Sequence, residues 1–579
     1  WAWGPGPTGG NVFFSNPPPP PPPDNTVNVN IISFELDSEI IRDGESATLS
    51  WTVENATSCS IDQGIGTVDP EAGSVAVSPD TDTVYTLECL QTGDSDAAEA
   101  ELTVYPAAGT FDNAIQEGGT GGDGLYEMAV HTNGSLYVSG AYGTSDSIWG
   151  EPPSQTTLSA SGANSNGVFA KYDSSLNLAW AKRLKNVVAT NLSFLGNGQV
   201  VISGTTAGDA EFNPGELNSI PLTNTGYNPF VAVADSDGTV LWARSATGGS
   251  SVGAGTNDSA RLSDNSILLI GSFSGSLTFA QGTPGQVTIT ATGVASGFIA
   301  RYESDGDFLW AKRITAGGTG KVYPAAVSVN ADDTFVIGGA ISESAIFGPG
   351  EANATTLTAT PAPGFGYNAF IAKYNANGTL AWAKQATSGA NSVIYDMSRM
   401  AGGDLIVSGH FGFSPSYLSV TIGPGSTSPV IFTGSNHDQH AWMGRFSASG
   451  ELNWAKRSSS GTASIWRNTL SSGEDEVFSM GSCSGGTVFG DGEAGEMAIP
   501  GETTSVFSCF TRFSSSNGLL QDGFAFPKSS NSSPSFAIFD AYRMAYGGNL
   551  GETTIFGEGS NQKTIVPAGG DAFIATYWK

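Results

Sequence analysis

Short segments in which apolar and polar residues alternate follow one another along most of the chain. Residues 46–53, SATLSWTV, and 84–90, VYTLECL, are examples, and turn-forming residues separate such segments. A period of two is typical of β-strands with one buried face, whereas helices require a period near 3.6. No helical period interrupts the pattern in the later part of the chain. The pattern therefore predicts an all-β protein.

The strands predicted in residues 26–106 have the spacing of a β-sandwich. Residues 44–62, GESATLSWTVENATSCSID, and 78–90, SPDTDTVYTLECL, resemble the immunoglobulin-like modules common in bacterial surface proteins. Antibody domains have the order Cys…Trp…Cys, but here Trp51 precedes both cysteines. That departure argues against the usual bridge between sheets and favours one within a single sheet.

From residue 107 to 579 the chain repeats itself, with a predicted strand that ends in glycine in every copy. The third strand of each copy follows it, and the fourth, outermost strand carries Trp in five of them. We count seven copies. The Trp residues and the Phe that takes the sixth place are Trp180, Trp242, Trp310, Trp382, Trp454 and Phe524.

The last copy stops before its fourth strand, because Lys579 lies only five residues after Ile574. A spare strand with Phe111, Ala114 and Ile115 precedes the first copy. A ring of four-stranded sheets in which this strand completes the last sheet explains both facts, and closure removes exposed sheet edges. Residues 131–140, HTNGSLYVSG, and 195–204, LGNGQVVISG, resemble the bacterial β-propeller repeat family. The resemblance implies a seven-bladed β-propeller over residues 107–579, closed by an N-terminal strand.

Basic residues gather at two positions of the repeat, one on the third strand and one beside the Trp. Thirteen of the 23 Lys and Arg side chains lie there. Such an even distribution suits contacts between neighbouring blades and is poor geometry for a single substrate site. We therefore interpret the Trp-Ala-Lys segments as structural, with the Trp packed between blades.

The chain carries 54 acidic and 23 basic residues, a net charge of −31. This charge repels phosphate backbones and anionic lipids, which argues against binding nucleic acid or a membrane surface. No run of 18 apolar residues predicts membrane insertion. The first residue is Trp1, and no basic leader or apolar segment precedes the folded part; we expect an exported protein whose signal peptide has been removed, or a fragment of a longer precursor.

The four cysteines form two local pairs, Cys59 with Cys89 and Cys483 with Cys509. Neither pair has the spacing of a zinc or redox motif. We predict two structural disulfides, with free buried thiols as the alternative, and disulfides imply an oxidising compartment.

Residues 1–25 form a segment of their own, in which seven prolines, 17–23, predict a stiff polyproline II spacer. The arm ahead of this spacer has no charged side chain, and such a surface needs a partner to cover it. Its apolar residues are Trp1, Trp3, Val12, Phe13 and Phe14. We expect these residues to contact another subunit.

Candidate catalytic motifs are weak. Residues 437–440, HDQH, offer His437, Asp438 and His440 to a metal from a predicted loop, and surface polar residues are the alternative. Residues 249–253, GSSVG, match a nucleophile motif that requires an α/β fold. Residues 316–321, AGGTGK, lack the first glycine of a phosphate-binding loop. We predict no catalytic residue, no metal site and no cofactor.

Two further repeated segments have structural explanations. Residues 235–238, DSDG, and 303–306, ESDG, resemble parts of calcium loops, but hairpin turns favour the same residues, which leaves opportunistic calcium as the alternative. Segments such as FNPGEL present Glu216, Glu351 and Glu493 in a ring. We expect these carboxylates to balance the basic residues, with a cation or basic partner as the alternative.

These expectations favour a non-enzymatic extracellular structural protein, a subunit of a surface filament or layer that self-associates through its arm. The first alternative is a monomeric adhesin or lectin-like module that binds a cell-surface protein or glycan on the propeller face. A secreted hydrolase with an unfamiliar site in the channel mouth is the second.

Overall fold

The computed structural model describes residues 28–579 except 161–165, 250–254, 360–365, 389–390, 413–418, 434–438, 460–464, 473–475, 494–495, 500–505, 527–534, 541–542, 552, 559–560, 569 and 579. All regular structure in the described residues is β-strand, which confirms the all-β prediction for them. Among them there is no helix long and apolar enough to cross a membrane. The chain divides into two compact units, Trp1–Ala107 and Ala108–Lys579.

The first unit contains two sheets. One has the order β1 (Asn30–Leu36), β3 (Ala47–Glu54) and β6 (Ala72–Val77). The other has the order β2 (Ile40–Arg42), β8 (Asp94–Tyr105), β7 (Thr83–Gln91), β4 (Ser58–Ile61) and β5 (Gly66–Val68). Alternate residues of β3, such as Leu49 and Trp51, are buried in the core of this unit because side chains point to opposite faces of a strand. The Cys59–Cys89 disulfide joins β4 to β7 inside one sheet, at directly opposite positions.

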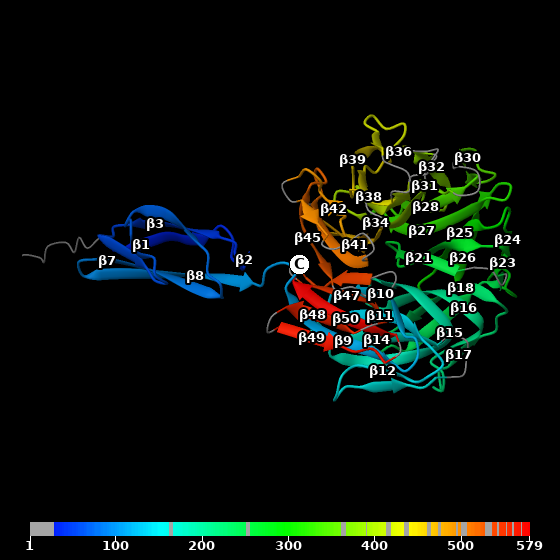
Figure 1. The fold of residues 1–579 in the computed structure, drawn as a ribbon, viewed down its shortest axis with the longest axis horizontal. Helices are drawn as coiled ribbons and strands as arrows, with labels where there is room; N and C mark the ends of the chain where they lie inside the picture. The colour runs from blue at the N-terminus through cyan, green and yellow to red at the C-terminus, as the bar shows by residue number, and fades with distance from the viewer. Residues whose placement is uncertain are drawn as a thin grey trace, which may run out of the picture. The chain divides into compact units, whose positions relative to one another are not determined.

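The second unit is propeller-like and is built from groups of four antiparallel strands, which Figure 1 shows arranged about a common centre. The first two groups share β15 (Leu178–Phe194). Their other strands are β10 (Gly124–Val130), β11 (Leu136–Tyr142), β14 (Asn166–Tyr172), β16 (Val200–Phe212), β18 (Tyr227–Ala234) and β19 (Val240–Ser245).

The next groups follow in chain order. Their strands are β21 (Gly255–Arg261), β22 (Ile267–Phe273), β25 (Ser296–Tyr302) and β26 (Phe308–Ala316); β27 (Lys321–Val329), β28 (Phe335–Ser342), β31 (Asn368–Tyr374) and β32 (Leu380–Gln385); β34 (Asn391–Arg399), β35 (Leu405–Gly412), β38 (Gln439–Phe446) and β39 (Leu452–Arg457); and β40 (Ile465–Ser472), β41 (Glu476–Ser484), β44 (Val506–Ser514) and β45 (Leu520–Phe526).

Short outer hairpins accompany the groups. They comprise β12 (Ser147–Trp149) and β13 (Thr156–Leu158); β17 (Ile220–Leu222), which pairs with β16; β23 (Gly275–Phe279) and β24 (Val287–Thr290); β29 (Ser344–Phe347) and β30 (Thr355–Thr358); β36 (Ser419–Ile422) and β37 (Val430–Thr433); β42 (Val488–Phe489) and β43 (Met497–Ala498); and β48 (Thr554–Glu558) and β49 (Asn561–Ile565). Two of these hairpins receive a further short strand, β20 (Thr247–Gly249) on β23 and β33 (Thr387–Ser388) on β36.

The second strand of a group is buried on both faces, unlike the strands of the first unit. Every residue of β22, ILLIGSF, is buried. Its side chains lie in clusters that combine residues of adjacent groups, such as Val201 with Phe298. A strand that is covered on both faces has a nearly continuous run of apolar residues. The sequence shows this pattern in the second strands of the groups. The core of the second unit therefore lies between the groups.

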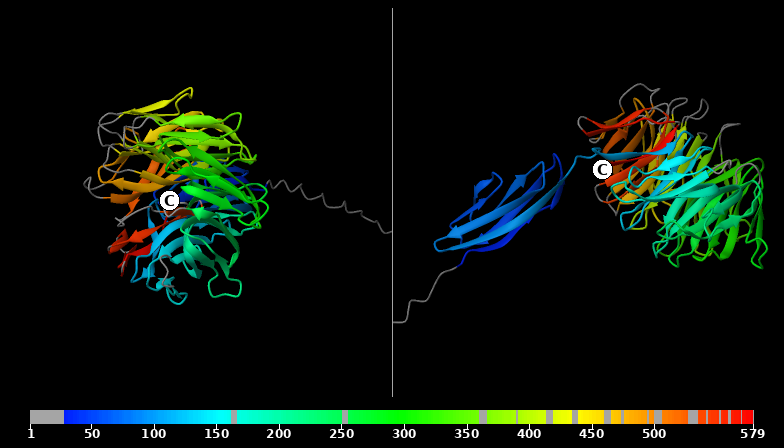
Figure 2. Two further views of the ribbon diagram at one scale, coloured as in Figure 1. Left: turned by 90° about the vertical axis from the view of Figure 1, so that its right-hand side faces the viewer. Right: turned by 90° about the horizontal axis from the view of Figure 1, so that it is seen from below.

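The last group contains β46 (Ser535–Ile538), β47 (Arg543–Leu550), β50 (Asp571–Trp578) and β9 (Phe111–Gly119). The strand with Phe111, Ala114 and Ile115 is thus its fourth strand, and Ile115 lies opposite Ile574. β9 also pairs with β12 of the first group, as β26 pairs with the hairpin that follows it. In Figures 1 and 2 the red C-terminal strand accordingly lies beside the blue β9.

The first and last groups are also joined at their innermost strands. The backbone N–H of Met128 in β10 donates a hydrogen bond to Ser535 Oγ in β46, at 3.0 Å. Residues more than 400 positions apart in the chain are therefore neighbours, and the groups form a ring.

Candidate functional site: the central channel

The first strands of successive groups surround a central channel with a volume of about 570 Å³. Its walls come from β10, the end of β15, β21, β27, β34, β40 and β46 (Figure 1). The lining is mixed, with apolar residues such as Met128 and Val327 beside three acidic ones, Glu127, Asp258 and Asp396. These three carboxyl groups are the only ones that the described residues place on the channel wall.

A β-bulge near the start of β10, β21 and β34 sets where these side chains lie. The pairing shifts between Leu125 and Glu127 in β10, between Thr256 and Asp258 in β21, and between Ile394 and Asp396 in β34. A bulge redirects the side chain that follows it, because one residue is left unpaired. Each acidic residue therefore follows a bulge directly.

The bulge also explains the glycine that lies within the second strand of the groups that have it. A Cβ atom at Gly271 would collide with the carbonyl oxygen of Gly255, and one at Gly409 would collide with that of Val393. The glycine is needed where the bulged strand brings its backbone close. In the fourth group this position is Gly339, opposite Pro324, one residue later than the Gly338 that the repeat pattern suggests.

Asp258 bonds to both neighbouring inner strands. Its Oδ1 accepts a hydrogen bond from Asn191 Nδ2 at 2.8 Å, and its Oδ2 accepts one from the N–H of Val327 at 2.7 Å. Burial raises the pKa of Asp258 to about 7, against the lowering effect of the N–H groups of Val327 and Ser259. This carboxyl group therefore links three groups of the ring.

Asp396 makes the same kind of link, because its Oδ2 accepts a hydrogen bond from the N–H of Thr469 at 2.6 Å. Burial raises its pKa to about 8, and the Asp258 carboxylate contributes to the shift. Burial also raises the pKa of Glu127 well above its usual range, with further contributions from Asp396 and Asp258. The three acids therefore influence one another across the channel.

The channel therefore carries three carboxyl groups with raised pKa values, and backbone or amide donors engage two of them, Asp258 and Asp396. An acid of this kind can hold a proton near neutral pH. Catalysis by a carboxyl pair requires groups free to reach a substrate, and Asp258 and Asp396 are held by N–H groups of the next strand. In the described residues no group of three or more His, Cys, Asp or Glu side chains is arranged to hold a metal ion.

The Trp and basic residues of the repeat contact the next group of the ring. Trp180 Nε1 and Lys171 Nζ both donate hydrogen bonds to the carbonyl oxygen of Ser236, at 3.1 and 3.3 Å. Trp454 and Arg445 bind the carbonyl oxygen of Ser515 in the same way. We call this contact the blade clasp. The residues of the blade clasp therefore form contacts between groups, in agreement with the interpretation of the Trp-Ala-Lys segments as structural.

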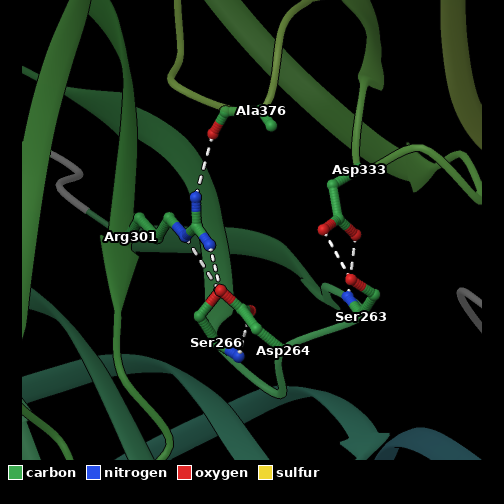
Figure 3. Close-up of polar contacts among 6 residues, drawn as sticks. All are labelled: Ser263, Asp264, Ser266, Arg301, Asp333 and Ala376. Atoms are coloured by element: carbon green, nitrogen blue, oxygen red, sulfur yellow. Dashed lines mark hydrogen bonds and ion pairs between the residues drawn. The ribbon is translucent and has the colours of Figure 1, made fainter.

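Figure 3 shows the basic residue of one clasp in detail. Arg301 donates through Nη1 to the carbonyl oxygen of Ala376, at 3.0 Å, and through Nε to Ser266 Oγ, at 2.8 Å. It also forms an ion pair with Asp264 of its own group. The N–H and the hydroxyl group of Ser263 donate hydrogen bonds to the carboxyl group of Asp333 in the next group. These bonds join the turn between β21 and β22 to the turn between β27 and β28.

The glutamates of the FNPGEL-type segments balance basic residues, as predicted. Glu216 pairs with Lys182 at 3.0 Å, Glu351 with Lys312 at 2.9 Å, and Glu493 with Lys456 at 2.5 Å. Each pair connects the fourth strand of one group to the outer hairpin of the next.

The structure contains both disulfides, and Cys483–Cys509 joins the paired strands β41 and β44. The described part of the chain has no free cysteine. The arm residues Trp1, Trp3, Val12, Phe13 and Phe14 lie outside the described residues.

The weak catalytic motifs fall in different places. His437 and Asp438 lie outside the described residues, and His440 is buried in β38 with its Nδ1 atom 2.9 Å from the carbonyl oxygen of Ser458. Residues 250–253 of the GSSVG segment are likewise outside the described residues. The AGGTGK segment connects β26 to β27, so a strand follows it and not a helix.

The turns with DSDG and ESDG have the geometry of hairpin connections. The N–H of Gly238 donates to the carbonyl oxygen of Asp235, and the φ angle of Gly238 is +78°. Asp235 Oδ1 accepts hydrogen bonds from the N–H groups of Asp237 and Thr239. This carboxylate is therefore used within its own turn.

Sequence reasoning missed the three channel acids and a buried acid, Glu117. Glu127, Asp258 and Asp396 each lie thirteen residues before the glycine of the next strand, a spacing that the repeat contains. Glu117 is fully buried in β9, and its carboxyl group accepts hydrogen bonds from Tyr172 Oη and the N–H of Gly150, both at 2.7 Å. Burial raises the pKa of Glu117 to about 8. No local pattern in the sequence indicates this last site.

Comparisons with known proteins identify no family. No protein-family model matches the chain. No curated protein matches it either.

Several solved structures are similar over most of the chain, at low identity. A quinohemoprotein alcohol dehydrogenase, ADHIIG, from Pseudomonas putida HK5 is 11% identical, with 79% of this chain and 76% of that chain covered and a TM-score of 0.34. A protein of unknown function from Bacteroides thetaiotaomicron VPI-5482 is 10% identical, with 96% and 99% covered and a TM-score of 0.26. An auxiliary nutrient binding protein from Bacteroides ovatus ATCC 8483 is 9% identical, with 95% and 98% covered and a TM-score of 0.29. Similarity at this level carries neither activity nor ligands over to this chain.

Proposed function

We propose that this chain is a non-enzymatic extracellular structural protein, a subunit of a surface filament or layer that assembles through its N-terminal arm. In this proposal the four-strand groups are the blades of a closed seven-bladed β-propeller, and the first unit is an immunoglobulin-like sandwich. The propeller and the sandwich are rigid spacers, and the arm makes the contact between subunits.

The observation that carries the proposal is the use of the repeated polar residues. Lys171 and Trp180 bind the turn of the next group, and Arg445 and Trp454 do so four groups later. The channel acids Asp258 and Asp396 accept hydrogen bonds from neighbouring inner strands. An enzyme brings its reactive side chains together at one site. Here the repeated polar side chains are distributed around the ring, where they bind neighbouring groups to one another.

Export is supported by the two disulfides, because cystine persists in oxidising compartments and is rare in the cytosol. The net charge of −31 favours a soluble surface in a salty or calcium-containing exterior.

Assembly through the arm is supported by its composition. Residues 1–16 contain Trp1, Trp3, Phe13 and Phe14 and no charged side chain, and the proline run 17–23 follows. A stiff spacer holds its end away from the folded unit. Residues 11–15, NVFFS, have the character of a strand that adds to a sheet edge of a neighbouring subunit. Head-to-tail repetition of one such contact produces a fibre.

Deletion of residues 1–16 tests this proposal. The full chain is expected to form filaments or sheets in negative-stain electron micrographs and to sediment as a polymer. The deletion variant should sediment as a monomer with an unchanged melting temperature. A matched variant with Trp1, Trp3, Phe13 and Phe14 changed to Ser keeps the arm's length and should behave like the deletion. Polymerisation that survives both changes, or a full chain that stays monomeric at high concentration, contradicts the proposal.

A second candidate, a monomeric adhesin or lectin-like module, is favoured by the open channel of about 570 Å³ at the centre of the ring. In that case the channel mouth would bind a cell-surface protein or glycan. Glycan-array binding by the full chain, with loss of binding on changing exposed residues at the channel mouth, would support this candidate. Equal binding by the arm-deletion variant would separate it from the first.

A further inference from the structure

Two buried carboxyl groups face each other where the ring closes. Asp123 lies in the connection from β9 to β10 and is 5% exposed, and Asp571 is the fully buried first residue of β50. The two residues are separated by almost the whole ring in sequence. The chain brings them together because β9 pairs with β50 and the N–H of Asp123 donates to the carbonyl oxygen of Gly570.

Both carboxyl groups are half satisfied. The Oδ2 atom of Asp123 accepts a hydrogen bond from the N–H of Gly119 at 2.9 Å. The Oδ2 atom of Asp571 accepts hydrogen bonds from the N–H of Ala568, at 2.9 Å, and from Gln116 Nε2. The two remaining oxygens, Asp123 Oδ1 and Asp571 Oδ1, are buried without a hydrogen-bond partner among the described residues. A buried carboxylate oxygen with no partner is unfavourable, so each oxygen requires a hydrogen-bond donor, a proton or a cation.

Gly118 lies between the two side chains. A Cβ atom there would stand 2.8 Å from Asp123 Oδ2 and 3.0 Å from Asp571 Oδ1, so both carboxyl groups flank the same point. The surrounding segment 117–124, EGGTGGDG, is rich in glycine, and Gly122 beside Asp123 is exposed. Glu117 is not available at this point, because Tyr172 and Gly150 engage its carboxyl group.

The charge state of the pair also matters. Burial raises the pKa of Asp123 to about 6, and the Asp571 carboxylate contributes to the shift. At the neutral pH of most extracellular fluids Asp123 is therefore mainly ionised, next to a second acid. No Lys or Arg side chain forms an ion pair with either residue in the described part of the chain.

We propose that Asp123 and Asp571 bind a divalent cation, Ca²⁺, which fastens the closing strand β9 to the start of β50. Calcium prefers oxygen ligands and accepts carboxylates, backbone carbonyls and water together. The two partnerless oxygens would be its carboxylate ligands, and the glycine-rich segment and water would complete the coordination. The inference does not depend on the proposed function, because it concerns how the ring closes and not what the arm binds.

Calorimetry on the full chain, freed of metal with EDTA and titrated with CaCl₂ at pH 7.5, tests the proposal. The wild type should bind one more Ca²⁺ than Asp123→Asn and Asp571→Asn, and its melting temperature should rise by at least about 2 °C at saturation. In EDTA each variant should melt at or above the wild type, because the change removes a repulsive charge. The control is Asp237→Asn, which alters an exposed turn carboxylate and should keep the full calcium response.

Amide hydrogen exchange of the wild type tests the proposal without any substitution, so its result does not depend on whether the variants fold. Calcium should slow amide hydrogen exchange in residues 116–119 and 570–574 of the wild type and leave the first unit unchanged. A wild type whose melting and exchange ignore calcium would overturn the proposal, as would variants that keep the wild-type stoichiometry. A wild type that ignores calcium, and that gains more stability than Asp123→Asn when the pH is lowered from 7.5 to 5.5, would show that a proton and not a cation occupies the pair, which also overturns it.

Discussion

Trp180 lies directly on Gly238 of the next group in the ring, so that a Cβ atom added to Gly238 would stand 2.7 Å from the indole ring. The φ angle of Gly238 is +78°, a conformation that other residues adopt at a cost. The same relation joins Trp242 to Gly306, Trp310 to Gly378 and Trp382 to Gly450. The glycine turns, with Asp, Asn or Ser before the glycine, therefore contact the Trp of the preceding group as well as connecting their own hairpins.

This relation predicts a large effect for Gly238→Ala. The backbone strain costs about 1–2 kcal/mol, and the clash with Trp180 adds to it, so we expect a total loss of about 2–4 kcal/mol in the free energy of unfolding. Gly134→Ala is the matched control, because Gly134 has a φ angle of +81° with nothing within 4 Å of the added Cβ. Urea unfolding measures both, and equal losses would contradict the proposed packing.

The ion pair between Lys312 and Glu351 is expected to be asymmetric. Glu351 also accepts a hydrogen bond from the N–H of Leu380 through its Oε2 atom, at 2.7 Å. Lys312→Met should therefore cost less than about 1 kcal/mol, as partly exposed pairs do. Glu351→Ala should cost about 1–3 kcal/mol more, because the N–H of Leu380 loses its acceptor. In 1 M NaCl both losses should fall by the same small amount, so that the difference between the two variants stays unchanged; a difference that shrinks with salt would show that the charge pair dominates.

Stability should decrease as the pH rises from 6 to 9. Burial raises the pKa of Glu117 and Asp396 to about 8 and that of Asp258 to about 7. The folded chain therefore holds protons that the unfolded chain releases above about pH 4.5. Between about pH 4.5 and its own pKa in the folded chain, each group lowers the free energy of unfolding by up to about 1.4 kcal/mol for each unit by which the pH rises.

Thermal melts across this range, compared with those of Glu117→Gln, check the pH dependence. The variant should show a shallower decline, since its side chain cannot ionise. Identical slopes for the two proteins would mean that Glu117 is not protonated in the folded state.

The Cys59–Cys89 disulfide should stabilise the first unit alone. Changing both cysteines to Ala removes a bridge that closes a loop with a sequence separation of 30, and we expect a loss of about 2–4 kcal/mol for this unit. Calorimetry of the full chain should show one transition move to lower temperature while that of the second unit stays in place. A shift of both transitions would show that the two units unfold together.

Much of this architecture can be predicted from the sequence because it repeats. The Trp at positions 180 to 454 and the glycines within the buried strands recur at similar spacings, and each copy reinforces the interpretation of the others. The role of Phe111, Ala114 and Ile115 followed from a missing strand in the last copy. The Glu partners of the basic residues could also be anticipated, since both recur at fixed positions.

The channel acids and the closing pair were not predictable in the same way. Glu127 and Asp258 point to the channel only because a bulge precedes them, and a bulge is visible in strand pairing and not in composition. Asp123 and Asp571 meet only when the ring has closed, and nothing near either residue signals the other. The repeat thus predicts the contacts within a group and between adjacent groups. Closure of the ring depends instead on contacts between its first and last groups, which the repeat does not predict.

The central claim is that a strand from before the first repeat closes the ring. A cryo-electron microscopy map of the purified full chain at side-chain resolution tests it most directly. We predict that Phe111–Gly119 runs antiparallel beside Asp571–Trp578 of the same molecule, with Ile115 opposite Ile574. A last sheet that is complete without this strand, or one closed by the strand of a neighbouring molecule, would contradict the claim.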